Sequence, residues 1–192
     1  MKKILVLLMC LIGVVLADKD DDVAEILLAE MSYDECTKKA NIQACFAAQY
    51  RINELCKKRV KKTCDFVSVM DVVIGNYYYG GKGGEQNYTK ALEYFEKSCS
   101  GNHASEYGCA KVGGLYYLGQ VIEQDYFKAF KYTKKACDLE SGSGCNILGI
   151  LYEEGKGVRQ DYKKAKKYFG KACDLGEQFG CDKYTRYNRD GH

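Results

Sequence analysis

The sequence predicts an all-α solenoid, a row of antiparallel helix pairs, on three observations. The 192-residue chain has no proline and abundant lysine, glutamate, alanine, leucine and tyrosine, a composition typical of helices rather than of a disordered tail. A shift of the chain by 36 positions aligns residues 109–144 with residues 145–180, and 18 of the 36 positions match. Each copy holds two amphipathic segments separated by glycines, which is typical of a helical hairpin.

The first 17 residues are predicted to be a secretory signal peptide. Two lysines precede an apolar run from Ile4 to Leu16, and Ala17 follows it, before an acidic stretch. The run of about thirteen residues is shorter than the roughly twenty that a membrane-spanning helix needs. We expect cleavage after Ala17 rather than a lipid anchor on Cys10, because the apolar run continues beyond that cysteine. The mature chain is expected in the periplasm or outside the cell.

Charge gives no case for nucleic acid or an anionic membrane as a partner. Removal of Lys2 and Lys3 from the 29 basic residues leaves 27, against 26 acidic ones. A near-neutral chain has little attraction for phosphates. No later apolar run approaches membrane length, so no membrane span is expected.

The cysteines predict five disulfide bonds. Loss of Cys10 with the signal peptide leaves ten cysteines, an even number in an exported chain. Zinc is the rival interpretation, but zinc sites use Cys-x-x-Cys or histidine at short spacing, and His103 and His192 are the chain's two histidines. We therefore expect no metal. The consecutive pairs are Cys36 with Cys45, Cys56 with Cys64, Cys99 with Cys109, Cys137 with Cys145, and Cys173 with Cys181.

The repeats divide the chain into units. Residues 18–63 match the repeat poorly and are expected to form a divergent helical N-terminal cap that carries the first two cysteine pairs. The predicted repeats are residues 64–108, 109–144 and 145–181, followed by a C-terminal tail at 182–192. The earliest repeat matches the next at a shift of 38, because two extra residues lie in the Cys99–Cys109 interval.

Within a unit, the first helix is expected to run from the second cysteine of a pair to the Tyr-x-x-Gly position, as in residues 145–154. The second helix begins after Asp125 or Asp161, whose side chain can accept hydrogen bonds from the first turn. Glycines such as Gly155 permit the positive φ angle that ends the first helix. Each disulfide then joins consecutive units. It lowers the entropy of the unfolded chain and is expected to stabilise the folded state by roughly 2.5 kcal/mol.

A family resemblance supports this fold. The segment Leu148–Val158, followed by Asp161-Tyr162-Lys163-Lys164-Ala165, resembles the Sel1-like repeat, a variant of the tetratricopeptide repeat. With cysteines at seven-residue spacing, the chain is similar to the secreted Helicobacter cysteine-rich proteins over about residues 56–181. The middle copy departs from the pattern, with Gln120-Val121 where Lys-Gly is expected. The resemblance implies a right-handed superhelix and two functions, a protein-interaction scaffold or a β-lactamase and penicillin-binding protein.

Residues for catalysis are hard to find. A serine β-lactamase needs Ser-x-x-Lys, and no serine here has lysine at the third following position. Two histidines cannot build a zinc hydrolase, and bridged cysteines are not nucleophiles. Hydrolysis would require an unfamiliar arrangement, such as Glu153 or Glu154 activating water. Weak β-lactam hydrolysis remains the alternative implied by the resemblance, with catalytic residues unknown and no cofactor expected.

A binding scaffold needs only a rigid, varied face. Positions that differ between copies recur at i, i+4 and i+7 of the first helix, which is one helical face. We expect this face to be concave and to bind a protein or peptide, a peptidoglycan fragment of the cell wall, or a β-lactam, with the protein as a monomer; the alternative is an unconstrained surface. The amide of Asn146 could bond both groups of a partner's backbone. The expected binding residues are Asn76, Tyr79, Tyr117, Asn146, Ile150 and Glu153.

Overall fold

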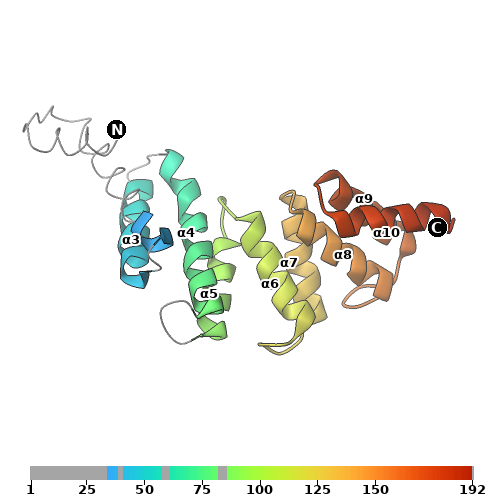
Figure 1. Ribbon diagram of the computed structural model, residues 1–192, viewed down its shortest axis with the longest axis horizontal. Coiled ribbons are helices and arrows are strands. Elements are labelled where there is room, and N and C mark those ends of the chain that lie inside the picture. The colour runs from blue at the N-terminus through green and yellow to red at the C-terminus, as the bar shows by residue number, and fades with distance from the viewer. Residues whose placement is uncertain (1–33, 39–40, 58–60, 82–85, 192) are drawn as a thin grey trace, which may run out of the picture.

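The computed structural model describes residues 34–38, 41–57, 61–81 and 86–191, and over these residues its regular secondary structure is entirely helical. Figure 1 shows the helices following one another along the long axis of the molecule, from α3 at one end to α10 at the other. The predicted all-α solenoid is confirmed. The helices are α3 (Ile42–Lys57), α4 (Lys61–Gly80), α5 (Tyr88–Ser98), α6 (Glu106–Leu118), α7 (Tyr126–Asp138), α8 (Gly142–Glu154), α9 (Tyr162–Asp174) and α10 (Gln178–Arg189).

Three helix pairs form the repeating units: α4 with α5, α6 with α7, and α8 with α9. Each pair also packs on the next, through α5 with α6 and through α7 with α8. The first helices contact one another along the row, α4 with α6 and α6 with α8. At the two ends, α3 packs on α4 and α10 packs on α9. We call the contact region between two consecutive first helices a joint.

Side-chain caps fix where the helices begin. Asp125 and Asp161 accept hydrogen bonds from the backbone N–H three residues further on, so the predicted caps of α7 and α9 are confirmed. Helix α8 begins three residues earlier than the sequence predicts, because Ser141, which lies within the loop closed by Cys137 and Cys145, caps it. Gly155 ends α8 with a φ of 68°, in the left-handed region, as expected.

Glycines without a side chain allow the helices to approach closely. A Cβ atom on Gly149 of α8 would lie 2.7 Å from the ring of Phe169 in its partner helix α9. Between units, a Cβ atom on Gly144 would lie 2.5 Å from the Cβ of Ala136. Both distances are shorter than any real Cβ contact, so glycine sets the helix spacing within and between units.

Tyrosines pack in pairs, one from each helix of a unit. The rings of Tyr116 and Tyr132 are stacked with centroids 6.1 Å apart, and those of Tyr152 and Tyr168 are stacked at 5.5 Å. Such pairs bury large apolar surface and leave the hydroxyls near the rim. Tyrosine therefore replaces part of the aliphatic core that short hairpins lack.

Disulfide bonds connect the ends of consecutive helices. Four of the predicted pairs are present, Cys36–Cys45, Cys99–Cys109, Cys137–Cys145 and Cys173–Cys181. Cys56 is also disulfide-bonded, and the side chain of Cys64, its predicted partner, lies outside the described residues. Three of these bridges link α5 to α6, α7 to α8 and α9 to α10, namely Cys99–Cys109, Cys137–Cys145 and Cys173–Cys181.

Both ends of the chain differ from the central units. The predicted signal peptide and most of the acidic stretch after it lie outside the described residues. Residues 182–189, which the sequence places in a C-terminal tail, belong to α10, so that α10 resembles the first helix of a further unit. No helix within the described ranges is both long and apolar enough to cross a bilayer.

Candidate protein-interaction surface

The residues expected on the binding face lie largely in the joints. Asn76 of α4 accepts a hydrogen bond through Oδ1 from the hydroxyl of Tyr107 in α6, at 3.4 Å. The hydroxyl of Tyr117 in α6 donates to Glu154 of α8, at 3.2 Å. Burial and the nearby Glu154 carboxylate both raise the pKa of Tyr117. These side chains hold neighbouring first helices together.

Asn146 is not on an exposed face, contrary to the sequence prediction. Its side chain is 8% exposed, and Oδ1 lies where a Cβ atom on Gly180 of α10 would be 2.8 Å away. Oδ1 is buried and accepts no hydrogen bond. The absence of a side chain at Gly180 lets α10 close over this amide, so a partner passing over the surface does not reach it.

Glu153 is engaged in the last joint. Its carboxylate accepts hydrogen bonds from Lys183 Nζ, at 2.7 Å, and from the hydroxyl of Tyr187, at 3.0 Å, both in α10. Burial raises the pKa of Tyr187, and the hydrogen bond to Glu153 adds to the effect. A carboxylate held in this way positions a helix, and it is a poor candidate for the water-activating base that hydrolysis would need.

Tyr79 and Ile150 are more accessible. Tyr79 is 36% exposed, and its ring contacts those of Tyr88 and Phe95 from α5. Ile150 is half-buried against the core of the last unit. Of the positions predicted from sequence, these two and the half-buried Asn76 contribute to the accessible face.

The accessible stripe of each first helix is rotated by about one residue from the predicted one. In α8 it consists of Ser143, Ile147, Ile150 and Glu154, the positions that are exposed or half-buried. Positions in the joints also differ between copies, because each joint pairs a different set of residues. Sequence variation alone therefore does not distinguish the accessible positions from those in the joints. The exposure pattern i, i+4, i+7, i+11 would have been the better signal.

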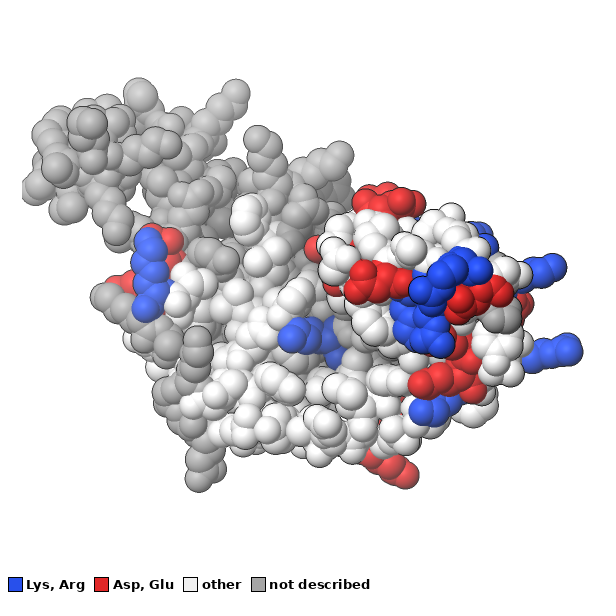
Figure 2. Space-filling model, turned by 45° about the vertical axis from the view of Figure 1, so that its right-hand side comes forward, with Lys and Arg blue, Asp and Glu red and all other residues white. Residues whose placement is uncertain are grey.

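Together these stripes form what we call the first-helix surface. It is mainly apolar, and its most accessible large apolar side chains are Tyr107, Leu118 and Phe179, which are 42%, 53% and 46% exposed. Figure 2 shows charged side chains crowded over the C-terminal end and an adjoining area with few charges. The surface comprises Val69, Val73, Asn76, Tyr79, Tyr107, Lys111, Gly114, Leu118, Ser143, Ile147, Ile150, Glu154, Phe179, Lys183 and Arg186.

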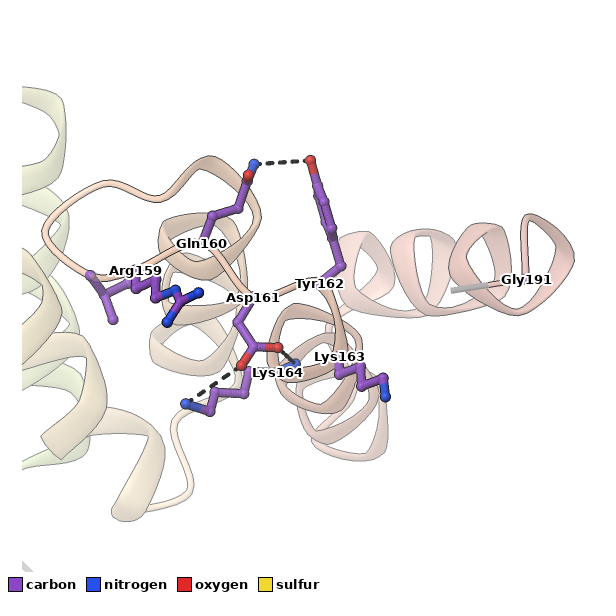
Figure 3. A pocket seen from close by; sticks show the side chains of 8 residues that line it. Arg159, Gln160, Asp161, Tyr162, Lys163, Lys164 and Gly191 are labelled. Atoms are coloured by element: carbon purple, nitrogen blue, oxygen red, sulfur yellow. Dashed lines mark hydrogen bonds and ion pairs between the residues drawn. The ribbon is translucent and has the colours of Figure 1, made fainter.

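An open hollow of about 660 Å³ lies at the start of α9, lined by residues 158–164 and by Gly191. Figure 3 shows that its polar side chains bond one another: Gln160 donates to the hydroxyl of Tyr162, at 2.9 Å, and Asp161 faces Lys164. The backbone N–H of Lys164 lowers the pKa of Asp161, as expected for a helix cap. The hollow therefore reflects the inter-helix loop and holds no arrangement suited to catalysis.

Serine hydroxyls also serve the fold. Ser105 and Ser141 cap α6 and α8, and the buried Ser98 donates to the carbonyl of Phe95. Within the described part of the chain, no group of three or more His, Cys, Asp or Glu side chains could hold a metal ion. No observation on these residues favours the β-lactam alternative.

Comparisons with known proteins agree with this geometry. The Sel1 repeat matches residues 74–103, 106–141 and 142–177, which is more than half of the chain. The protein therefore belongs to the Sel1 repeat family. A search of curated proteins finds no match.

Several solved structures are similar to the chain. A protective antigen of uropathogenic Escherichia coli with an SLR fold has a TM-score of 0.62 and 20% identity over 85% of this chain and 36% of that one, so this chain spans about a third of its length. A Sel1 repeat protein from Oxalobacter formigenes has a TM-score of 0.56 and 23% identity over 62% and 88% of the two chains. Helicobacter pylori cysteine-rich protein B is 31% identical over 70% of this chain and 95% of its own, with a TM-score of 0.49.

Proposed function

We propose that this protein is an extracytoplasmic scaffold that binds a protein or peptide segment on its first-helix surface. The observation that carries the proposal is the row of accessible apolar side chains on consecutive first helices, which includes Tyr107, Leu118 and Phe179. Sel1 repeats generally mediate contacts between proteins. Aromatic anchors on a helical face supply binding area at low entropic cost.

The packing supports a concave shape for this surface. Consecutive first helices contact one another more closely than consecutive second helices do. A row of hairpins that is tighter on one side curves toward that side, which would place the first helices on the inner face. An inner face surrounds an extended segment and buries more of it than a flat surface does.

The disulfide bonds support both the compartment and the mode of binding. Bonds of this kind persist in oxidising compartments and fit an extracytoplasmic protein, in line with the predicted signal peptide at residues 1–17. Because the bridges fix the ends of consecutive helices, the surface is ordered before it meets a partner. A pre-ordered surface loses little conformational entropy on binding.

Photo-crosslinking from the oxidised mature protein tests the proposal. A benzoyl-phenylalanine placed at position 107, on the first-helix surface, is expected to link a polypeptide from cell-envelope or host extracts, with the linked peptide identified by mass spectrometry. The matched control carries the same group at position 127, on α7, where Phe127 is 77% exposed. Tyr107→Ala with Leu118→Ala should weaken binding of the identified polypeptide about tenfold or more, and Phe127→Ala should leave it unchanged.

Two results would contradict the scaffold. One is equal linking from positions 107 and 127, which would indicate non-specific contact. The other is binding that survives the double substitution at Tyr107 and Leu118.

A further inference from the structure

Lys111 is a cation on the first-helix surface that has no carboxylate partner in the described part of the chain. It lies half-buried in α6, and its Nζ is 5.1 Å from the ring centroid of Tyr107 and 5.8 Å from that of Tyr79 in α4. Among the residues that the structure describes, it forms no ion pair and no hydrogen bond through its side chain. Aromatic faces attract an ammonium group, but less strongly than a carboxylate at hydrogen-bond distance does.

Comparison of Lys111 with the residues at the same repeat position in α8 and α10 shows how its surroundings differ. The same position is Ile147 in α8 and Lys183 in α10. Lys183 reaches back to the preceding first helix and pairs with Glu153, at 2.7 Å. The position of Glu153 is occupied in α4 by Tyr79, so Lys111 reaches back to an aromatic ring instead of an acid.

Hydrogen-bonding groups lie beside the Tyr107 ring that the ammonium approaches. The Tyr107 hydroxyl donates to Asn76 Oδ1, at 3.4 Å, which leaves both N–H groups of that amide without an acceptor among the described residues. An amide donor, an ammonium group and two aromatic walls on adjacent helices match the needs of a carboxylate whose stem is apolar.

We propose that the joint between α4 and α6 binds the side-chain carboxylate of an aspartate or glutamate in the partner segment, with Lys111 as its counter-ion and Asn76 as a second donor. This proposal rests on the scaffold function and specifies the partner's chemistry. An internal side chain fits better than a chain terminus, because accessible apolar positions continue on both sides of Lys111. Tyr107 lies toward one end of α6 and Leu118 lies toward the other. The partner therefore carries an acidic residue flanked by apolar ones.

Peptide selection on the oxidised protein tests this. A phage library of random twelve-residue peptides, each fused through its C-terminus and so lacking a free carboxyl end, is selected on the wild type, Lys111→Met, Lys111→Glu and the control Lys131→Met. Lys131 is exposed on the second helix α7. Wild type and Lys131→Met should enrich an acidic residue between apolar ones, Lys111→Met should lose the acidic preference, and Lys111→Glu should replace it with a basic one.

Synthetic pairs of the enriched peptides then give the size of the effect. Exchange of the acidic residue for its amide should weaken binding to the wild type about tenfold and leave binding to Lys111→Met unchanged. A second library with free C-termini separates the two sources of a carboxylate. Selection there of peptides without an internal acid, in a manner that depends on Lys111, would overturn the side-chain assignment.

The remaining outcomes separate this proposal from the scaffold itself. Enrichment of apolar peptides without an acidic residue, or an acidic preference that survives Lys111→Met, overturns the carboxylate site and leaves the scaffold standing. Failure of the wild type to enrich any peptide contradicts both. Circular dichroism of each variant checks that the helices are retained.

Discussion

Two joints of the solenoid use a lysine at the same repeat position in different ways. Between α8 and α10, Lys183 is neutralised by Glu153 and the pair also holds the hydroxyl of Tyr187. Between α4 and α6, Lys111 lies over two tyrosine rings. The first arrangement pairs its charges, whereas in the second Lys111 has no carboxylate partner among the residues that the structure describes.

The difference teaches how a repeat protein separates structure from recognition. The glycines, alanines and cysteines that set the helix spacing recur in each unit, whereas the residues in the joints change from one unit to the next. A joint that satisfies its own polar groups stabilises the stack. A joint in which a hydrogen-bond donor or a charge has no partner within the protein can bind a group of another molecule. Four experiments test this distinction, and they follow in order of expected effect.

Loss of the bridge that ties α10 to α9 should have the largest effect. Cys173→Ala with Cys181→Ala is expected to lower the free energy of unfolding by about 2–5 kcal/mol, because the unfolded chain gains loop freedom. It should also release α10 and break the Lys183–Glu153 pair. Urea unfolding measures the stability, and hydrogen exchange of the α10 amides measures the release. Cys99→Ala with Cys109→Ala is the control, expected to cost a similar amount while α10 stays protected; equal protection of α10 in both variants would contradict the assignment.

The contact between α3 and α4, at the N-terminal end of the row, contains a buried carboxylate and predicts a dependence on pH. Burial raises the pKa of Asp71 to about 6, although the charge of Lys97 and the hydrogen bond from Gln49 act in the opposite direction. Because the folded state holds this proton more tightly than the unfolded state, the contribution of Asp71 to stability is fully present below about pH 4 and is lost as the pH rises through 6. The loss is on the order of 2–3 kcal/mol.

The comparison of wild type with Asp71→Asn isolates this group. Unfolding free energies at pH 4.5 and pH 7.5 should differ less in the variant than in the wild type, since the amide does not titrate. An identical pH dependence in the two proteins would show that Asp71 does not carry the effect.

Much of the fold follows from the sequence, because its signals are local. The cap residues Asp125 and Asp161, the left-handed Gly155 and the neighbouring cysteines act over fewer than about ten residues, so spacing alone identifies them. The repeat then multiplies each signal. The start of α8 was misplaced because a serine cap before the cysteine, Ser141, extends the helix backward.

The candidate site could be predicted only in part, because it depends on helix rotation. A shift of one residue turns a side chain by about 100° around the helix axis, enough to move it from the surface into a joint. Asn146 and Glu153 vary between copies as surface residues do, yet α10 covers the first and pairs with the second. Lys111 was not identified, since its significance lies in the residue at position 79 of α4, which is a tyrosine where α8 has Glu153.

Close contact between α10 and α9 gives the next prediction. Gly180→Ala places a Cβ atom 2.7 Å from Ala172 and 2.9 Å from the backbone oxygen of Phe169, which cannot move aside. It should destabilise the protein by about 1–3 kcal/mol. The matched control is Gly114→Ala in α6, whose new Cβ meets its nearest neighbour, Ile147, at 3.6 Å. That change should stabilise the helix by about 0.5–1 kcal/mol, and a loss of stability there would contradict the packing.

The smallest expected effect compares the two lysines directly. The side chains of Lys183 and Glu153 are 22% and 25% exposed, so their attraction is partly shielded from water. A double-mutant cycle of Lys183→Met and Glu153→Gln should give a coupling free energy of about 1 kcal/mol that declines in 1 M salt. Lys111→Met should change the free energy of unfolding by less than about 0.5 kcal/mol, because no carboxylate in the described joint loses its partner. If Lys111→Met costs as much as Lys183→Met, the cation between α4 and α6 serves the fold, and the contrast between a complete and an open joint is wrong.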